Sequence, residues 1–168
     1  MNLPSEDDAL AQSIAGSLLA REAKVAVVET TAGGLISARL LSVAGASRWY
    51  DRGVVAYTGT SKQDLVGIET ETLREQGSVS IPAVEAMATT FRERSGVAYC
   101  IAESGMAGPQ TGRRSAKPAG TSVIAVATPS GVVGREFLFD GTRLEVMACI
   151  AEAALEMLRD ELVTPATV

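Results

Sequence analysis

The sequence of 168 residues contains no histidine. A Ser-His-Asp triad, a Cys-His catalytic pair and a histidine-ligated zinc site therefore cannot be built from this chain alone. A general base in this chain has to be a lysine, an aspartate, a glutamate or a tyrosine. The missing histidine thus narrows the search for a catalytic base to four residue types.

Other features are scarce or missing as well. No apolar run approaches the roughly 20 residues of a membrane helix, and the acidic start MNLPSEDDAL does not resemble a signal peptide. The net charge is -5 and no stripe of Lys and Arg stands out, which argues against nucleic-acid binding. We therefore expect a cytoplasmic protein with neither a membrane nor a nucleic acid as partner. Only two cysteines are present, Cys100 and Cys149, and their apolar surroundings predict small core residues.

What is present indicates a folded α/β protein. Hydrophobic residues make up 46% and charged residues 21%, and the length suits one domain spanning residues 1–168. Strand-like and helical patterns alternate, which predicts an α/β sandwich around a mixed, mostly parallel sheet of about five strands. We expect strands over 24–29, 51–57, 97–102, 121–127 and 132–139. We expect the last two strands to form a hairpin. We expect helices over 34–41, 70–76, 80–94 and 142–161, the third with Ser80 as its N-cap and Gly96 after its end. We also expect an N-terminal helix capped by Ser5 and a short helix capped by Thr60 or Ser61.

Three polar or glycine-rich segments follow the first three predicted strands. They span residues 29–34, 57–62 and 103–108. Ligands of open α/β sheets usually bind outside the carboxyl ends of the strands. We therefore expect the three segments to meet at one site.

The first segment reads Glu29-Thr30-Thr31-Ala32-Gly33-Gly34. The glycines allow a ligand to approach closely and leave N–H groups free at a helix start, where an oxyanion is favoured. Thr30 could act as a nucleophile if a base takes its proton. The alternative is that the threonines only cap the helix and the glycines only pack.

In the second segment a strand delivers Tyr57, and Lys62 follows five residues later. A lysine that is partly buried in a site can have its pKa lowered toward neutrality and then serve as a base. The alternative is an ordinary surface lysine on a short helix.

The third segment opens a predicted loop over residues 104–120. Its hydroxyl and glycines could form a nest for an oxyanion or a phosphate, or they could simply form a flexible turn. Arg113, Arg114 and Lys117 could attract an anionic substrate or be solvated charges. Arg143, at the start of the last helix, could line the pocket or lie in solvent. No spacing of acidic residues indicates a metal site, and we expect no cofactor.

In this order the motifs resemble the CinA C-terminal domain family, which includes nicotinamide mononucleotide amidases. The family motif Glu-Ser-Cys-Thr-Gly-Gly-Leu corresponds to residues 29–35, and Val-Val-Ala-Tyr with a lysine five residues on corresponds to residues 54–57 and Lys62. Thr-Gly-Ile-Ala-Gly-Pro corresponds to residues 104–109, and Lys-Pro-x-Gly-Thr to residues 117–121. The resemblance spans nearly the whole chain and implies a three-layer α/β/α domain. Many relatives carry an extra N-terminal domain that we expect this chain to lack.

The resemblance also implies a function. Active relatives hydrolyse the carboxamide of nicotinamide mononucleotide, a pyridine nucleotide, to nicotinic acid mononucleotide and ammonia. Carried over, Thr30 is the nucleophile, Lys62 its base, and Tyr57 assists by hydrogen bonding. Oxyanion contacts come from the backbone around Gly33 and Gly34 or Gly105. The implied substrate-binding residues are Glu29, Thr31, Gly33, Gly34, Ser104, Gly105, Ala107, Gly108 and Arg143. Self-association as a homo-oligomer is implied too.

Three of the departures from the family pattern bear on the implied chemistry. Thr30 replaces a serine, which adds a methyl group and stiffens χ1, and Ser104 replaces a threonine. Met147 stands where the family often has an arginine. If that arginine binds the substrate phosphate, a charge-assisted contact of about 1.5–3 kcal/mol is lost. The alternative function is therefore a catalytically weak or inactive binding or regulatory domain.

Overall fold

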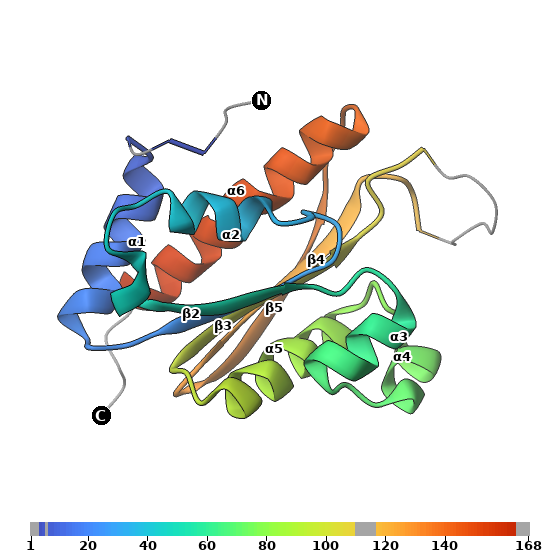
Figure 1. Cartoon of the computed structure of the whole chain (residues 1–168). Helices are drawn as coiled ribbons and strands as arrows, with labels where there is room; N and C mark the ends of the chain where they lie inside the picture. The colour runs from blue at the N-terminus through green and yellow to red at the C-terminus, as the bar shows by residue number, and fades with distance from the viewer. Residues whose placement is uncertain (1–3, 6, 110–116, 164–168) are drawn as a thin grey trace.

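The computed structural model of the chain describes residues 4–5, 7–109 and 117–163. A sheet with the strand order β2-β1-β3-β4-β5 forms its centre (Figure 1). The strands are β1 (Val25–Glu29), β2 (Tyr50–Val55), β3 (Tyr99–Gly105), β4 (Thr121–Thr128) and β5 (Gly131–Leu138). β1 pairs in parallel with β2 and β3, whereas β4 pairs antiparallel with β3 and β5. Within the described sheet only β4 runs against the other strands, so the predicted mixed, mostly parallel sheet is confirmed.

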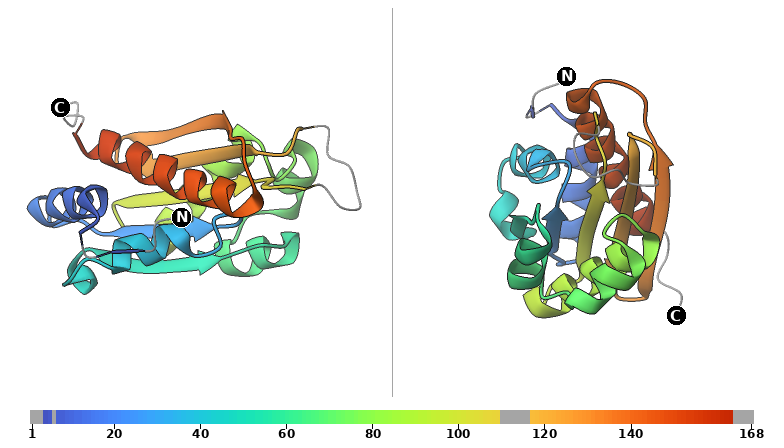
Figure 2. Two further views of the ribbon diagram at one scale, coloured as in Figure 1. Left: turned by 90° about the horizontal axis from the view of Figure 1, so that it is seen from above. Right: turned by 90° about the vertical axis from the view of Figure 1, so that its right-hand side faces the viewer.

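Helices cover both faces of the sheet, which confirms the three-layer sandwich (Figures 1 and 2). α1, α2 and α6 lie on one face, and α5 with the short helices α3 and α4 lies on the other. Their bounds are α1 (Ala9–Ala20), α2 (Leu35–Leu41), η1 (Ala46–Arg48), α3 (Gly59–Ser61), η2 (Lys62–Val66), α4 (Thr70–Gln76), α5 (Ile81–Ser95) and α6 (Arg143–Val163). None of the helices in the described residues combines the length and apolarity needed to cross a membrane.

The alternation of side chains along the strands creates two cores. Val25 and Val27 of β1 pack in the core beneath α1, α2 and α6, whereas Ala26 and Val28 pack in the core beneath α5. All five residues of β1 are buried, because helices cover both faces of this strand. Because consecutive side chains of a strand point to opposite faces, polar residues that follow one another at a strand end lie on different faces of the sheet.

Two of the predicted helix starts were wrong. The N-cap of α1 is Asp8 and not Ser5, since the Asp8 carboxylate accepts the Ala11 N–H and is anchored by Arg39. The short helix α3 is capped by Thr58 and not by Thr60 or Ser61. Thr58 has an extended backbone and exchanges hydrogen bonds with Ser61 in a capping box.

Other local predictions were confirmed. Ser80 caps α5, and Gly96 ends it in the left-handed conformation at φ 66°. β4 and β5 form the expected antiparallel hairpin. Cys100 is buried as predicted, but Cys149, on α6, is only half-buried, so the prediction of a core residue was wrong for it.

Two strands end elsewhere than predicted. β2 stops at Val55, two residues earlier than expected, where its pairing with Glu29 of β1 ends. β3 continues to Gly105, because β4 pairs with it as far as Ser122. Ser104 and Gly105 therefore lie on a strand and not in the predicted loop.

Candidate functional site

The three segments that follow β1, β2 and β3 meet at one edge of the sheet, as the sequence predicts. Glu29 at the end of β1 lies opposite Val55 at the end of β2, and the preceding Val28 lies opposite Ala102 of β3. A pocket of about 540 Å³ opens at this edge. Its lining includes Thr30, Tyr57, Lys62, Ser104, Gly105 and Lys117.

Lys62 is buried at this pocket, with only 3% of its surface exposed. It opens η2, a π-helical turn, and its Nζ donates a hydrogen bond of 3.2 Å to Ser104 Oγ. Burial lowers the pKa of Lys62, and the negative charge of Glu103 partly opposes that effect. Of the two alternatives left open for Lys62, the structure has the buried lysine and not the surface lysine.

The hydroxyl groups of the first segment have backbone partners. Thr30 Oγ1 donates to the carbonyl of Ala56 at 3.2 Å. Thr31 Oγ1 accepts from the N–H of Gly105 at 2.7 Å and donates to its carbonyl at 3.0 Å. Thr30 lines the pocket beside Lys62, but the hydroxyl that Lys62 contacts is that of Ser104. The pairing of Thr30 with Lys62 stays a prediction.

Glu29 is fully buried and caps the start of α2. Its Oε2 accepts from the N–H groups of Gly34 (2.8 Å) and Ile36 (3.1 Å). Its Oε1 accepts from the N–H and the hydroxyl of Ser37, at 2.9 and 2.6 Å. Glu29 thus holds the helix that follows the glycine pair. The expectation that the Gly34 N–H is free was wrong, because this N–H donates a hydrogen bond to the Glu29 carboxylate.

Glu103 opens the third predicted segment, but the sequence analysis assigned it no role in the site. It is fully buried on β3, and its Oε1 accepts from the N–H groups of Thr30 (2.5 Å), Thr31 (2.6 Å) and Ala32 (2.8 Å). Burial raises the pKa of Glu103 to about 7 against the opposing effect of these hydrogen bonds, and Glu29 adds to the rise. The signal in the sequence was an acidic residue directly after the apolar run VAYCIA.

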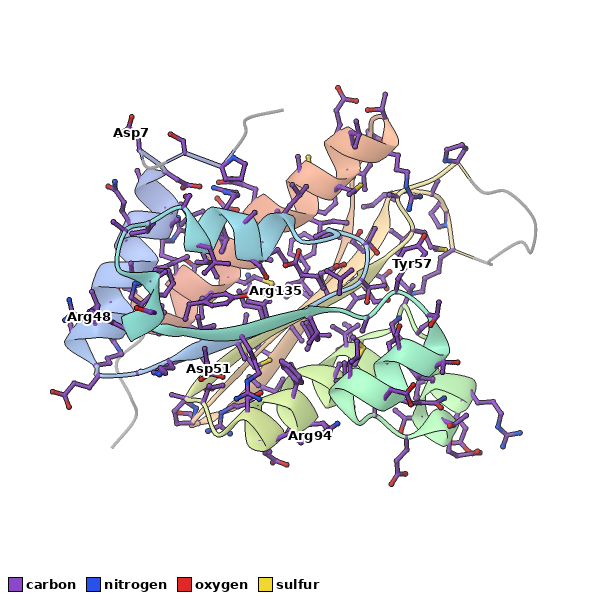
Figure 3. The ribbon with its side chains drawn as sticks, in the orientation of Figure 1. Asp7, Arg48, Asp51, Tyr57, Arg94 and Arg135 are labelled. Carbon is purple, nitrogen blue, oxygen red and sulfur yellow. The ribbon has the colours of Figure 1, made fainter. Side chains whose placement is uncertain are left out.

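Tyr57 and Arg143 join the second and third segments to the start of α6. Tyr57 is 60% exposed, and Figure 3 shows it beyond the end of β2. Arg143 donates to the Tyr57 hydroxyl and to the carbonyl of Gly108, both at 3.1 Å. Ala107 is buried in the core beneath α6. Arg143 therefore links Tyr57 and Gly108 at the edge of the site.

Gly33 and Met147 lie beside each other. Gly33 has φ 65°, and a Cβ at this position would lie 3.3 Å from the terminal methyl of Met147. The side chain of Met147 packs against the core beneath α6. An apolar group thus occupies the place where the family often has an arginine.

Lys117 lies at the far end of the predicted loop. It lines the pocket and forms an ion pair with Glu136. Arg113 and Arg114 lie outside the described residues. Within the described ranges, no group of three or more Cys, Asp or Glu side chains could hold a metal ion.

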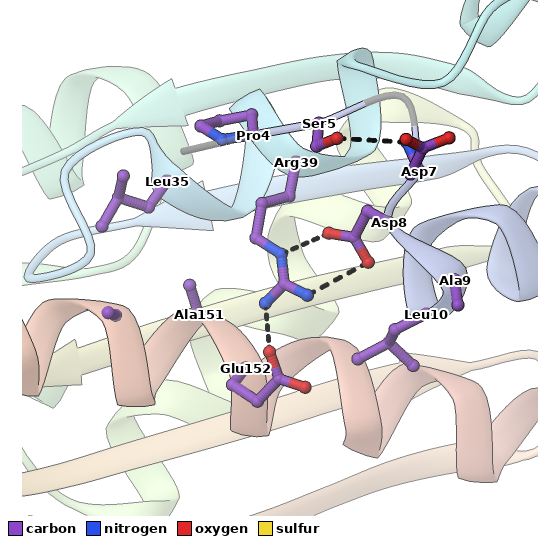
Figure 4. Close-up of a pocket in the computed structure, with 11 residues that line it drawn as sticks. Pro4, Ser5, Asp7, Asp8, Ala9, Leu10, Leu35, Arg39, Ala151 and Glu152 are labelled. Carbon is purple, nitrogen blue, oxygen red and sulfur yellow. Dashed lines mark hydrogen bonds and ion pairs between the residues drawn. The ribbon is translucent and has the colours of Figure 1, made fainter. Parts of the chain in front are cut away.

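A second pocket, of about 780 Å³, lies between α1, α2 and α6. Figure 4 shows Arg39 inside it, with Asp8 and Glu152 on either side. Arg39 is 2.7 Å from the Asp8 carboxylate and 2.5 Å from that of Glu152. None of the site residues predicted from the sequence line this pocket.

Comparison with known sequences identifies the family. The family profile described as the CinA C-terminal domain matches residues 7–162. A CinA-like protein from Shewanella loihica is 40% identical over 154 residues, which cover 91% of this chain and 36% of that protein. A putative competence-damage inducible protein from Desulforamulus reducens is 38% identical over 156 residues, which cover 92% of this chain and 38% of that protein. The chain thus spans little more than a third of the length of these curated relatives.

Solved structures share the fold. The competence/damage inducible protein CihA from Agrobacterium tumefaciens has a TM-score of 0.88 and 34% identity, covering 98% of this chain and 99% of that chain. A CinA superfamily protein from Klebsiella pneumoniae has a TM-score of 0.86 and 30% identity, covering 91% and 95%. From the profile match and these identities, the chain belongs to the CinA C-terminal domain family.

Proposed function

We propose that this chain is an amidohydrolase that converts nicotinamide mononucleotide to nicotinic acid mononucleotide and ammonia. The observation that carries the proposal is the pocket at the strand ends, where buried Lys62 contacts the Ser104 hydroxyl and Thr30 lines the same space. A lysine whose pKa is lowered by burial is more often neutral, and a neutral amine can take the proton of a hydroxyl. A chain without histidine can perform amide hydrolysis in this way.

The proposed chemistry has two steps. Thr30 Oγ1 attacks the carboxamide carbon while the amine of Lys62 takes the hydroxyl proton. The tetrahedral intermediate collapses, the lysine returns the proton to the leaving nitrogen, and ammonia departs from an ester on Thr30. Water then attacks that ester and gives one proton to Lys62. The second tetrahedral intermediate collapses, Lys62 returns the proton to Thr30 Oγ1, and nicotinic acid mononucleotide leaves.

Ser104 has a separate role in this proposal. Its oxygen accepts from Lys62, so its own O–H proton can be donated elsewhere. We assign that proton to the carbonyl oxygen of the substrate, where charge develops in the tetrahedral intermediate. The backbone N–H of Gly105 does not serve this purpose, because it is bonded to Thr31.

The pocket also suits a pyridine mononucleotide. Its volume of about 540 Å³ lies in the range of small-ligand sites. The exposed ring of Tyr57 offers a face to the pyridine ring, and the substrate phosphate would replace Glu136 as the ion-pair partner of Lys117. These features support the substrate that the family resemblance implies.

One observation favours the alternative of a binding domain with little turnover. The hydroxyl of Thr30 is bonded to the carbonyl of Ala56 and not to Lys62, so it must rotate before it can attack. Threonine resists such rotation more than serine does.

Ammonia release from nicotinamide mononucleotide tests the proposal, with Thr30→Ala as the control. We expect release by the wild type and a loss of about a hundredfold or more in the variant. If the wild type releases no ammonia but the nucleotide raises its Tm, the binding domain is supported. If neither happens, this substrate is wrong. Self-association stays a prediction that light scattering of the purified chain can test.

A further inference from the structure

Glu103 has an unusual set of contacts for a buried glutamate. One carboxylate oxygen accepts three consecutive backbone N–H groups, those of Thr30, Thr31 and Ala32. A concave run of backbone N–H groups of this kind is suited to binding an anion. Here a side chain of the protein itself, 73 residues away from Thr30, fills it.

We propose that Glu103 is a positioning residue for Thr30, because its carboxylate fixes the backbone from which the Thr30 side chain enters the pocket. The inference rests on the proposed function, in which Thr30 is the nucleophile. It assigns to Glu103 no contact with the substrate, since Glu103 is fully buried and does not line the pocket.

The conformational stiffness of threonine makes this backbone hold effective. The position of the Thr30 hydroxyl depends on the backbone, which Glu103 holds, and separately on χ1, which the β-branched side chain restricts to few rotamers. Hydrogen bonds to an ionised carboxylate are shorter and roughly twice as strong as neutral ones. The bonds from the N–H groups of Thr30 and Thr31, at 2.5 and 2.6 Å, are shorter than ordinary N–H···O bonds. A misplacement of about 1 Å at a reacting atom can cost roughly a hundredfold in rate.

Glu103 also acts on Lys62 across the strand. Glu103 and Ser104 are consecutive on β3, so their side chains lie on opposite faces, and Ser104 is the one that contacts Lys62. The charge of Glu103 raises the pKa of Lys62, whereas burial lowers it. Among the described residues, the other charged groups nearby include Glu29, which acts on Glu103 from β1, and Lys117, which lines the pocket. Loss of the Glu103 charge should therefore lower the pKa of Lys62.

The test is Glu103→Gln, which keeps an acceptor oxygen but removes the charge. We expect amide exchange at Thr30, Thr31 and Ala32 to become faster by about tenfold. We expect kcat to fall by about tenfold or more with KM within about twofold. Because Lys62 must be neutral to act, activity rises with pH through its pKa, and the acid limb of the kcat profile should move to lower pH.

Two further variants separate the effects. Glu103→Asp keeps the charge but shortens the side chain, so it should lower kcat while leaving the acid limb in place. Glu152→Gln makes the same chemical change on α6, beside Arg39 in the other pocket (Figure 4), and should change neither.

Two readouts need no substrate, namely amide exchange and the pKa of Lys62 measured by NMR with 13C-labelled lysine. If Glu103→Gln changes neither of them, the positioning role is overturned, whatever the activity. If the wild type releases no ammonia, the proposed function fails separately, and these two readouts still decide whether Glu103 holds Thr30 and acts on Lys62.

Discussion

The two pockets of this protein differ in the partners of their basic residues Arg39 and Lys62. In the larger one, between α1, α2 and α6, Arg39 lies between Asp8 and Glu152 and its charge is neutralised (Figure 4). In the smaller one, at the strand ends, Lys117 is ion-paired with Glu136, but the buried Lys62 forms no ion pair within the described part of the chain. Its contacting group is a neutral hydroxyl, that of Ser104.

This difference indicates which pocket carries chemistry. Arg39 is paired with two carboxylates, so it links the helices and its charge is already neutralised. A desolvated lysine costs stability, and such groups are concentrated at functional sites. The chemistry of the lining therefore identifies the candidate active site, although the other pocket is the larger.

The largest expected effect comes from removing the lysine. Lys62→Met should lower ammonia release by about 10²–10⁴-fold, the usual contribution of a general base. The Tm should stay the same or rise, because the variant no longer buries an amine. Fluorescence of Trp49, the single tryptophan and 1% exposed, can follow unfolding. Activity within about twofold of the wild type would remove Lys62 from the mechanism.

Thr30→Ser should raise the activity of the pocket at the strand ends, because the side chain at position 30 becomes freer to rotate. The serine lacks the methyl group that restricts χ1, so its hydroxyl can leave the carbonyl of Ala56 more easily. We expect kcat to rise by about tenfold, which is within the cost of a misplaced hydroxyl. Steady-state ammonia release measures it, with Thr31→Ser as the matched control. A fall in kcat as large as that of Thr30→Ala would contradict the proposed role.

Arg39→Met should produce the reverse pattern in the other pocket. The variant leaves Asp8 and Glu152 without their cation, which we expect to cost about 1–3 kcal/mol of the free energy of unfolding. The Tm should fall by roughly 2–10 °C, while ammonia release stays unchanged. A loss of activity at unchanged Tm would mean that the two pockets are coupled.

The smallest effect is the opposite pH dependence of two carboxyl groups. The pKa of Glu103 is raised to about 7 from an ordinary 4.5, so the folded state holds more protons in that interval. Its contribution to stability therefore falls as pH rises through the interval. The pKa of Asp8 is lowered, chiefly by its hydrogen bond to Arg39. Its contribution is therefore present above its unfolded pKa of 3.8 and is lost as pH falls.

Urea unfolding followed by Trp49 fluorescence can measure both effects. The free energy of unfolding of Glu103→Gln, relative to the wild type, should increase as the pH rises from about 5 to about 8. The free energy of unfolding of Asp8→Asn should fall less than that of the wild type as the pH is lowered below 3.8. If the stability difference between variant and wild type changed with pH in the same direction for both variants, this assignment would be contradicted.

Much of the fold followed from local patterns. The apolar runs predicted the strands, and Ser80 with Gly96 marked the ends of α5. Local patterns failed where several residues could do the same job. Ser5 and Asp8 are both good N-caps, and the choice fell to Asp8, which Arg39 holds from α2. The extent of β3 was missed because the pairing of Gly105 with Ser122 of β4 extends it.

The candidate site divides in the same way. The sequence placed Thr30, Tyr57, Lys62 and Ser104 in segments after the strands, and the pocket brings all four together. It did not reveal that Glu103 holds the Thr30 backbone, since an acidic residue after an apolar run does not show which backbone groups it will meet. Nor did it reveal that Lys62 contacts Ser104 and not Thr30.

The sequence by itself determined the alternation of strands and helices, the helix ends with strong caps, and the absence of histidine chemistry. These depend on neighbours along the chain, which the sequence states directly. Only the tertiary structure decided which groups face each other at the strand ends. Glu103 meets Thr30 across 73 residues and Lys62 meets Ser104 across 42, because parallel strands bring distant carboxyl ends to one edge of the sheet.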